Sequence, residues 1–348
     1  MNILYAVQAT GNGHISRAME LLPYLEQYGR VDVFLSGANS NLPLDAPVKY
    51  RSKGLSLFYN CRGGLDYWQL IKKIQPARIR SEVNQLPVEK YDLIINDFEY
   101  ITAAACAKKG IPSVNFGHQA SFQSAHTPRP VKKSRTGEWV LKSYAKASRY
   151  IGLHFKKYDD FIFTPVIKRE ILQAPVSDKG HIIVYLPAYC ERQLKAVFSE
   201  WGDIRFEIFS HQTHSPRTEG NIRFFPIDKQ LFNESFAHCH GIITGGGFET
   251  PAEALHMGKK MISIPIKGQY EQQCNAAALA AMGVTCLSSL SRGFDTVFER
   301  WMQQKDHLQQ DYSRSTEQAL MYLFSDTEQY NLKHSPATPS NILNALLF

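Results

Sequence analysis

Short apolar runs alternate with longer amphipathic stretches along the whole chain, a pattern typical of parallel strands joined by crossover helices. In the first half, the pattern predicts strands at 3–8, 31–36, 92–97 and 112–117, and helices near 16–28, 66–84, 99–109 and 138–155. In the second half, it predicts strands at 181–186, 205–210, 221–225, 241–244 and 260–265, with helices between them. The expected class is therefore α/β.

The chain divides into two such series of strands and helices. Its 348 residues exceed the size at which one hydrophobic core usually keeps growing, so two domains are expected. The segment YDDFIFTPV at 158–166 ends in a proline and is the best candidate for a linker, which gives domains at 1–160 and 161–348. The last helix could return to pack on the first domain.

The apolar runs, such as MISIPI at 261–266, are shorter than the ~20 residues of a membrane-spanning helix, so none is expected. The N-terminus enters a strand pattern without the features of a signal peptide, and we expect a cytoplasmic protein. The cysteines contain no CxxC pair, which argues against a zinc or redox site, and we expect buried free thiols. They are Cys61, Cys106, Cys190, Cys239, Cys274 and Cys286.

Positive charge is concentrated in the first half. Residues 1–160 carry 22 Lys and Arg against 13 Asp and Glu, a net charge of +9, whereas residues 161–348 carry 17 against 19, a net charge of −2. Within 129–157 there are nine Lys or Arg and one acidic residue, Glu138, a local charge of +8. The first half therefore presents the basic surface.

The basic stretch also fits an amphipathic helix beginning near 138. Its apolar positions are Val140, Tyr144, Ala147, Ile151 and Phe155, and its basic positions are Lys142, Lys146 and Arg149. Such a helix commonly binds an anionic membrane surface, which would make the protein peripheral on the inner membrane face. The alternative is a core-facing helix with a solvated outer face. Nucleic acid is not expected, because the stretch lacks a known reading motif.

The first strand runs into a glycine-containing turn that ends in His14. Gly11 and Gly13 allow a sharp turn, and the helix that follows offers free N–H groups to an anion. His14 would project into a cleft, where its imidazole could accept a proton near neutral pH. The alternative is a plain strand–helix turn in which the histidine caps the helix or packs.

Asp97 ends the strand at 92–97 and should face the same side of the sheet as His14. Its carboxylate could accept a hydrogen bond from the imidazole and stabilise the protonated form. Taken alone, Asp97 would more often be a helix cap. Together with His14 it becomes a candidate catalytic dyad.

The most specific string spans 241–275. The strand GIIT leads into Gly245, Gly246 and Gly247, and the next helix carries Thr250 and Glu253. The glycines and the helix N-terminus could bind phosphate, and a carboxylate one turn into the helix could accept hydrogen bonds from two ribose hydroxyls. Glu271 and Gln272 at a second helix start could bind sugar hydroxyls. For the glycines alone, the alternative is a tight turn.

This string resembles the donor-site signature of GT-B glycosyltransferases, both those that modify small molecules and the bacterial muramyl-peptide N-acetylglucosaminyltransferase. The similarity covers nearly the full chain, and it implies two Rossmann-like doubly wound domains that face each other across a cleft. The residues that the resemblance assigns to the donor are Phe225, Ile227, Gly245, Gly246, Gly247, Phe248, Thr250, Glu253, Glu271 and Gln272. Those assigned to the acceptor side are Gly11, Gly13, His118 and Gln119, and His14 and Asp97 form the catalytic pair.

The resemblance implies an inverting hexosyltransferase that moves a hexose or N-acetylhexosamine from a UDP-sugar to a lipid-linked or other hydroxyl acceptor. It implies no metal site and no cofactor besides the UDP-sugar substrate. Two positions depart from many members: Gly245 replaces a histidine, and Glu271 replaces an aspartate. Two rival interpretations remain, a UDP-sugar 2-epimerase and a non-catalytic nucleotide-sugar-binding or membrane-docking subunit.

Overall fold

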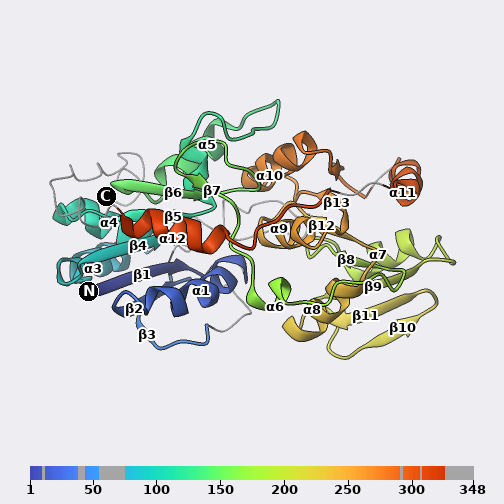
Figure 1. Ribbon diagram of the computed structural model, residues 1–348, viewed down its shortest axis with the longest axis horizontal. Coiled ribbons are helices and arrows are strands. Elements are labelled where there is room, and N and C mark those ends of the chain that lie inside the picture. The colour runs from blue at the N-terminus through green and yellow to red at the C-terminus, as the bar shows by residue number, and fades with distance from the viewer. Residues whose placement is uncertain (10–11, 38–43, 55–74, 291–292, 306–307, 326–348) are drawn as a thin grey trace.

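The computed structural model describes residues 1–9, 12–37, 44–54, 75–290, 293–305 and 308–325. Within these residues the strands form two seven-stranded sheets, and Figure 1 shows them in the two halves of the molecule. The predicted α/β class is confirmed. Gly11 and Cys61, the first part of the helix expected at 66–84 and the C-terminal tail lie outside the described residues.

The first sheet is parallel throughout its described pairs, in the order β3-β2-β1-β4-β5-β6-β7. Its strands are β1 (Asn2–Gln8), β2 (Arg30–Ser36), β3 (Val48–Ser52), β4 (Leu93–Asp97), β5 (Val114–Gly117), β6 (Arg149–Leu153) and β7 (Ile162–Phe163). The helices of this half are α1 (Asn12–Leu25), α3 (Pro76–Gln85), α4 (Tyr100–Lys109) and α5 (Arg135–Ser143), with short 3-10 turns η1 (Val88–Lys90) and η2 (Gln119–Gln123).

The second sheet has the order β10-β11-β9-β8-β12-β13-β14, and only the pair β10–β11 is antiparallel among its described pairs. Its strands are β8 (His181–Tyr185), β9 (Arg205–Ser210), β10 (Arg217–Glu219), β11 (Ile222–Pro226), β12 (Gly241–Gly245), β13 (Lys260–Ile264) and β14 (Thr285–Cys286). The helices are α6 (Arg169–Leu172), α7 (Glu191–Phe198), α8 (Lys229–His238), α9 (Glu249–His256), α10 (Tyr270–Ala281), α11 (Phe294–Gln303) and α12 (Ser315–Ser325).

The buried side chains of β1 show why the strands read as continuous apolar runs. Tyr5 and Val7 belong to one hydrophobic cluster, whereas Leu4 and Ala6 belong to another, because successive side chains point to opposite faces of the sheet. The first of these clusters continues into the second half through residues such as Phe248. The two halves therefore share apolar packing.

The last described helix, α12, returns to the first half. Figure 1 shows α12 lying over the first sheet, after the chain has passed through the second. Arg149 on β6 donates hydrogen bonds to the carbonyl oxygens of Tyr322 (2.7 Å) and Leu323 (3.3 Å). The Tyr312 hydroxyl donates to the Phe155 carbonyl oxygen at 2.8 Å. These contacts hold α12 against β6 and β7.

The helix predicted at 138–155 is confirmed only up to Ser143 and is wrong beyond it. The helix α5 ends at Ser143, and residues 149–153 form the strand β6 between β5 and β7. Ile151 and Phe155 are fully buried, but in the packing around a sheet strand rather than on a helix face. At Gly152 an added Cβ would lie 2.6 Å from the Ser121 Cα atom, so the close approach of η2 requires glycine here. Pairing with β5 and β7 on either side holds the backbone extended.

Other boundaries also differ from the predictions. The helix expected at 16–28 begins at Asn12, so His14 lies in its first turn. Ile162 and Phe163 form β7 inside the segment expected to be the linker, and the chain crosses between the sheets after Phe163. The short strands β3, β10 and β14 were not predicted, because two to five residues carry little periodic signal.

No helix among the described residues is both long enough and apolar enough to cross a membrane. The described cysteines are free: Cys106, Cys239 and Cys274 are buried, and Cys190 and Cys286 are half-buried.

Candidate active site

The predicted site residues lie where the strand order of each sheet reverses. In the first sheet this point is between β1 and β4, and His14 follows β1 while Asp97 ends β4. In the second sheet it lies between β8 and β12, and Gly245 ends β12. Open α/β sheets bind ligands at the carboxyl ends of their strands at such points.

Four side chains form what we call the charged contact: His14, Arg17, Asp97 and Glu249. The hydrogen bond predicted between His14 and Asp97 is present, with 2.9 Å between Nδ1 and Oδ1. The Arg17 guanidinium binds both Asp97 oxygens, at 2.8 Å from Nη2 and 3.1 Å from Nε, and its Nη1 donates to Glu249. Because Glu249 begins α9, this contact joins the two sheets.

The backbone around Asp97 is arranged to hold its carboxylate. At Gly117 on β5, an added Cβ would lie 2.6 Å from Asp97 Oδ1, so only glycine leaves room for it. Phe98, which follows Asp97 in the chain, has a φ of 55°, in the left-handed region that is unusual for a bulky side chain. Glu99 caps α4 by accepting hydrogen bonds from the N–H groups of Ile101 and Thr102. The capping role considered for Asp97 therefore belongs to Glu99.

The two carboxyl groups on Arg17 titrate very differently. Burial alone would raise the pKa of Asp97, but the charges of Arg17 and His14 outweigh it and hold the pKa at about 2. Burial raises the pKa of Glu249 to about 7, with Arg17 opposing the shift and the Glu253 charge adding to it. Asp97 is thus ionised at neutral pH, and Glu249 changes its charge there.

The glycine turn after β12 is closed on one side and open on the other. At Gly246 an added Cβ would lie 2.7 Å from the Gln272 carbonyl oxygen and 2.9 Å from the Pro265 Cβ atom. At Gly247 it would meet nothing within 4 Å. Thr250, half-buried, lies in the first turn of α9. The open side of the turn and this helix start together suit an anion.

A second contact between the sheets, which we call the amide contact, is formed by His118, Gln119, Glu271 and Asn275. The His118 Nε2 and Asn275 Oδ1 atoms are 2.8 Å apart, and the Asn275 amide donates to the Gly246 carbonyl at 3.0 Å. Gln119 donates to Glu271 at 3.1 Å. The residues expected on the acceptor and donor sides thus touch each other here.

The amide contact also orients the glycine turn. Because the peptide between Gly246 and Gly247 is trans, fixing the Gly246 carbonyl toward Asn275 directs the Gly247 N–H the opposite way. The His118 ring stacks on Phe248, with 3.9 Å between ring centroids and 9° between planes. Burial lowers the pKa of His118, so it favours the neutral imidazole.

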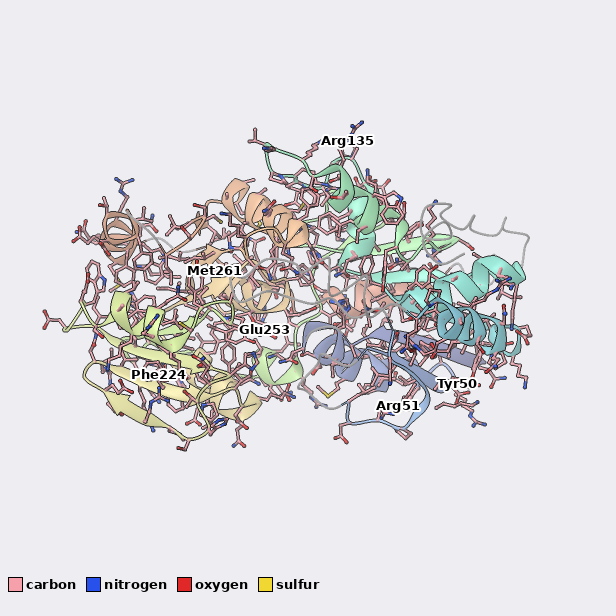
Figure 2. All side chains as sticks on the ribbon, turned by 180° about the vertical axis from the view of Figure 1, so that it is seen from behind. Tyr50, Arg51, Arg135, Phe224, Glu253 and Met261 are labelled. Atoms are coloured by element: carbon pink, nitrogen blue, oxygen red, sulfur yellow. The ribbon has the colours of Figure 1, made fainter. Side chains whose placement is uncertain are left out.

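The remaining donor-side predictions are placed as follows. Glu253 is buried, forms an ion pair with Lys168 at 3.0 Å, and lies near the middle of the molecule in Figure 2. Gln272 accepts a hydrogen bond from the Ile266 N–H at 2.8 Å, which leaves its amide nitrogen as the group that could donate to a ligand. An added Cβ at Gly245 would meet Gln272 at 3.7 Å, an ordinary contact.

Phe225 lies apart from these residues. Its buried ring stacks on Phe209 at 5.1 Å and lies under the Arg223 guanidinium at 4.5 Å, so the ring faces the protein rather than an open surface. Ile227 is half-buried just beyond β11. Since β9 and β8 separate β11 from β12, three strand spacings, about 14 Å, lie between them. A base placed here would meet backbone groups rather than the Phe225 ring.

The sequence analysis missed Arg17 and Glu249. Arg17 is three positions after His14 on the same helix, and this spacing places both on one face. Glu249 gave no comparable signal. An added Cβ at Gly13 would lie 3.1 Å from the Glu249 Cγ atom, so the glycine allows α9 to approach α1. Among the described residues, no three His, Cys, Asp or Glu side chains are grouped closely enough to hold a metal ion.

Comparison with known proteins adds a family and a fold. The model of a family described as glycosyl transferase family 1 matches residues 1–295. No curated protein sequence gives a significant match. Of the solved structures, a glycotransferase of kitacinnamycin is 14% identical, with a TM-score of 0.56 over 94% of this chain and 95% of that one.

Two further structures are similar over almost their full length. MurG from Acinetobacter baumannii is 15% identical, with a TM-score of 0.52 over 99% of this chain and 97% of its own. UGT89C1 from Arabidopsis thaliana, in complex with UDP, is 12% identical, with a TM-score of 0.56 over 99% of this chain and 98% of its own. At such identities the likeness concerns the fold.

Proposed function

This chain belongs to glycosyl transferase family 1 and has the GT-B fold, and we propose that it is an inverting, metal-independent hexosyltransferase that uses a UDP-sugar. The observation that carries the proposal is the charged contact, which places a His14–Asp97 pair beside the start of α9, just after the glycine turn of the other sheet. A nucleotide-sugar donor is further supported by UGT89C1, whose structures hold UDP and UDP-L-rhamnose.

In the proposed reaction, His14 takes the proton of an acceptor hydroxyl through Nε2. Its Nδ1–H donates to Asp97, whose ionised carboxylate stabilises the imidazolium that forms. The acceptor oxygen then forms its bond to the anomeric carbon from the side opposite to the leaving UDP. One displacement of this kind inverts the anomeric configuration.

The leaving diphosphate gathers negative charge, which the open side of the glycine turn suits. The Gly247 N–H, the Thr250 hydroxyl and the N-terminal end of the α9 dipole would stabilise that charge as it develops. Glu253 would bind the ribose, and Glu271 and Gln272 would bind the hydroxyls of a hexose or N-acetylhexosamine. In this scheme the backbone and helix replace a metal ion at the diphosphate.

A screen of UDP-sugars, with UDP release measured in the presence and absence of EDTA, tests the proposal. We expect UDP affinity by calorimetry, slow hydrolysis of one UDP-sugar, and no effect of the chelator. Release of a rearranged sugar without any acceptor would instead identify a 2-epimerase. UDP binding without turnover of any UDP-sugar would favour a non-catalytic binding subunit.

We further propose that the acceptor is lipid-linked and that the basic stretch docks the protein on an anionic membrane surface. The loop before α5 exposes Lys132 and Lys133 beside Val131, which is fully exposed, and the exposed Arg135 begins α5. Figure 2 shows Arg135 at the outer edge of the molecule. An apolar tip surrounded by cations suits a headgroup region.

The structure also reduces the number of charges available for docking. Arg129 donates to Glu138 at 2.6 Å and to the carbonyl oxygens of Thr127 and Phe122, and Arg149 binds α12. These two arginines hold the fold together. The lysines therefore carry most of the proposed attraction.

Sedimentation with vesicles tests the membrane proposal. Binding to anionic vesicles should fall between 0.1 M and 1 M salt, because the Debye length shortens from ~10 Å to ~3 Å. Replacing Lys132, Lys133, Lys142 and Lys146 by glutamate should release the protein without changing UDP affinity. Equal pelleting with neutral and anionic vesicles, or none with either, would reject membrane docking and favour a soluble acceptor.

A further inference from the structure

Arg17 is a buried cation that contacts carboxylates from both sheets. Its side chain is 3% exposed, and its guanidinium binds Asp97 of the first sheet and Glu249 of the second. Burial lowers the pKa of Arg17, but the two carboxylates outweigh burial and raise it, so the guanidinium stays charged. Nothing in the proposed reaction so far requires Arg17 or Glu249.

The charge balance around His14 depends on Glu249. With Glu249 ionised, the two carboxylates and the guanidinium together carry a net charge of −1, which stabilises the positive charge that His14 gains when it takes the acceptor proton. With Glu249 protonated or displaced, Asp97 and Arg17 cancel. The imidazole then loses much of the field that stabilises its protonated form, and a base must hold a proton to be effective.

The tautomer of His14 depends on the same groups. The Nδ1 atom is 2.9 Å from Asp97 Oδ1 and 3.0 Å from Arg17 Nη2. If Nδ1 carries a hydrogen, it donates to Asp97 and leaves Nε2 free to accept a proton. If Nδ1 accepts from Arg17 instead, Nε2 carries the hydrogen and cannot act as a base. Glu249 counters the guanidinium charge from the Nη1 side and so favours the first arrangement.

We propose that Arg17 and Glu249 are positioning residues that set the tautomer of His14 and the charge around its ring, so that the base is fully effective only when α9 is docked against α1. The inference deepens the proposed role of His14 as a base and rests on it. Its consequence is a link between the sheets: the half that holds the donor also prepares the base that activates the acceptor.

Other titratable groups near the charged contact do not replace Glu249. Burial raises the pKa of Tyr5 on β1, so its hydroxyl stays neutral. Glu253 on α9 is paired with Lys168 at 3.0 Å, and the two charges cancel. Burial lowers the pKa of His118 after β5, which keeps it neutral as well. Among these described groups, Glu249 is the one whose change of charge near neutral pH alters the net charge around His14.

The tautomer of His14, read from its ring nitrogen signals by NMR, tests the inference on the full chain, with UDP present. Histidine is isotope-labelled, and the His14 signal is assigned by its loss in His14→Gln. In Glu249→Gln we expect the fraction of neutral His14 that carries its hydrogen on Nδ1 to fall. In Arg17→Met this fraction should rise, and the double variant should match Arg17→Met, because Glu249 acts through the guanidinium.

The opposite signs separate electrostatic tuning from a simple structural latch, since both single variants break the same ion pair. Tyr270→Phe is the matched control, because it removes another hydrogen bond between the sheets, to Glu138 at 2.7 Å, and should leave the His14 tautomer unchanged. If Arg17→Met does not fold, the isosteric Glu249→Gln decides alone. An identical His14 tautomer in Glu249→Gln and wild type would overturn the inference. The readout needs no sugar donor, so it is independent of the UDP-sugar screen.

Discussion

The charged contact and the amide contact join the same two sheets with opposite chemistry. In the charged contact, one guanidinium binds two carboxylates, and one of these has a pKa near 2 and the other near 7. In the amide contact, a neutral histidine and an asparagine side chain hold a backbone carbonyl of the glycine turn. The first contact contains a carboxyl group that titrates near neutral pH, and the second contact holds the backbone of the glycine turn.

The histidines of the two contacts differ in burial. His118 is 1% exposed, whereas the His14 side chain is 13% exposed. Buried, satisfied hydrogen bonds give a rigid arrangement, and partly exposed ionisable groups can reach a substrate. Under the proposed mechanism, the charged contact carries the proton transfer and the amide contact positions the glycine turn, so chemistry and positioning are separated at this interface.

The largest effect is expected from His14→Ala, which removes the proposed base. Transfer should fall by about 10²–10⁴-fold, the usual contribution of general base catalysis. UDP affinity should stay nearly unchanged, because the base acts on the acceptor. The rate of transfer and calorimetry with UDP check the two parts. Transfer within a few fold of wild type would remove His14 from the mechanism.

The charged contact should also make stability depend on pH. The pKa of Glu249 is about 7 in the folded protein, against an ordinary value of 4.5. Unfolding therefore releases its proton between these values, and the free energy of unfolding should fall as pH rises from 4.5 to 7, by at most about 3 kcal/mol. Asp97 acts in the other direction and at lower pH, with stability lost only below 3.8.

Urea unfolding of wild type and Glu249→Gln across this pH range measures the contribution. The free energy of unfolding of Glu249→Gln should not show this part of the decline. The difference in unfolding free energy between wild type and the variant should therefore change steadily from pH 4.5 to 7. Glu191→Gln, which breaks an arginine–carboxylate pair within the second half, is the control and should run parallel to wild type. Parallel curves for Glu249→Gln would show that Glu249 keeps an ordinary pKa.

The sequence predicted the strands that carry the site because each is a buried apolar run that ends in a polar or glycine residue. His14 and Asp97 could be paired from this rule alone, since both lie at carboxyl ends of expected strands. The strand β6 was misassigned because Ile151 and Phe155 fit a helical period as well as an extended one. Pairing with β5 and β7, which no local pattern encodes, favours the strand.

Arg17 and Glu249 could not be paired from the sequence. They are 232 positions apart and meet only because two helices of separate sheets come together. Gly13 gave a partial signal, but its closest neighbour, the Glu249 side chain, is visible only in the structure. Contacts between two independent sheets carry no periodicity, whereas strand ends do.

The next effect in size concerns the ribose. Glu253→Ala should weaken UDP binding by roughly 1–3 kcal/mol, because the hydroxyls lose a charged acceptor. The ion pair with Lys168 offers another route to a loss, and Lys168→Met separates the two: it removes the pair but keeps the carboxylate. Calorimetry should find a clear loss in Glu253→Ala and a smaller one in Lys168→Met. Unchanged UDP affinity in Glu253→Ala would place Glu253 outside the donor site.

The smallest effect is expected from Asn275→Ala, which breaks the amide contact. Without the Asn275 amide, the Gly246 carbonyl is free to turn, and the Gly247 N–H is no longer held toward the diphosphate. We expect UDP affinity to fall by about 1 kcal/mol, the usual value of one hydrogen bond, while the pH dependence of transfer stays that of wild type.

Asn221→Ala is the matched control, because Asn221 also donates to backbone carbonyls, those of Phe198, Trp201 and Ile204, at the far side of the same sheet. Both variants should lose stability, but only Asn275→Ala should lose UDP affinity. A shifted pH profile in Asn275→Ala would mean that the two contacts act on the same step, and the separation of chemistry from positioning would fail.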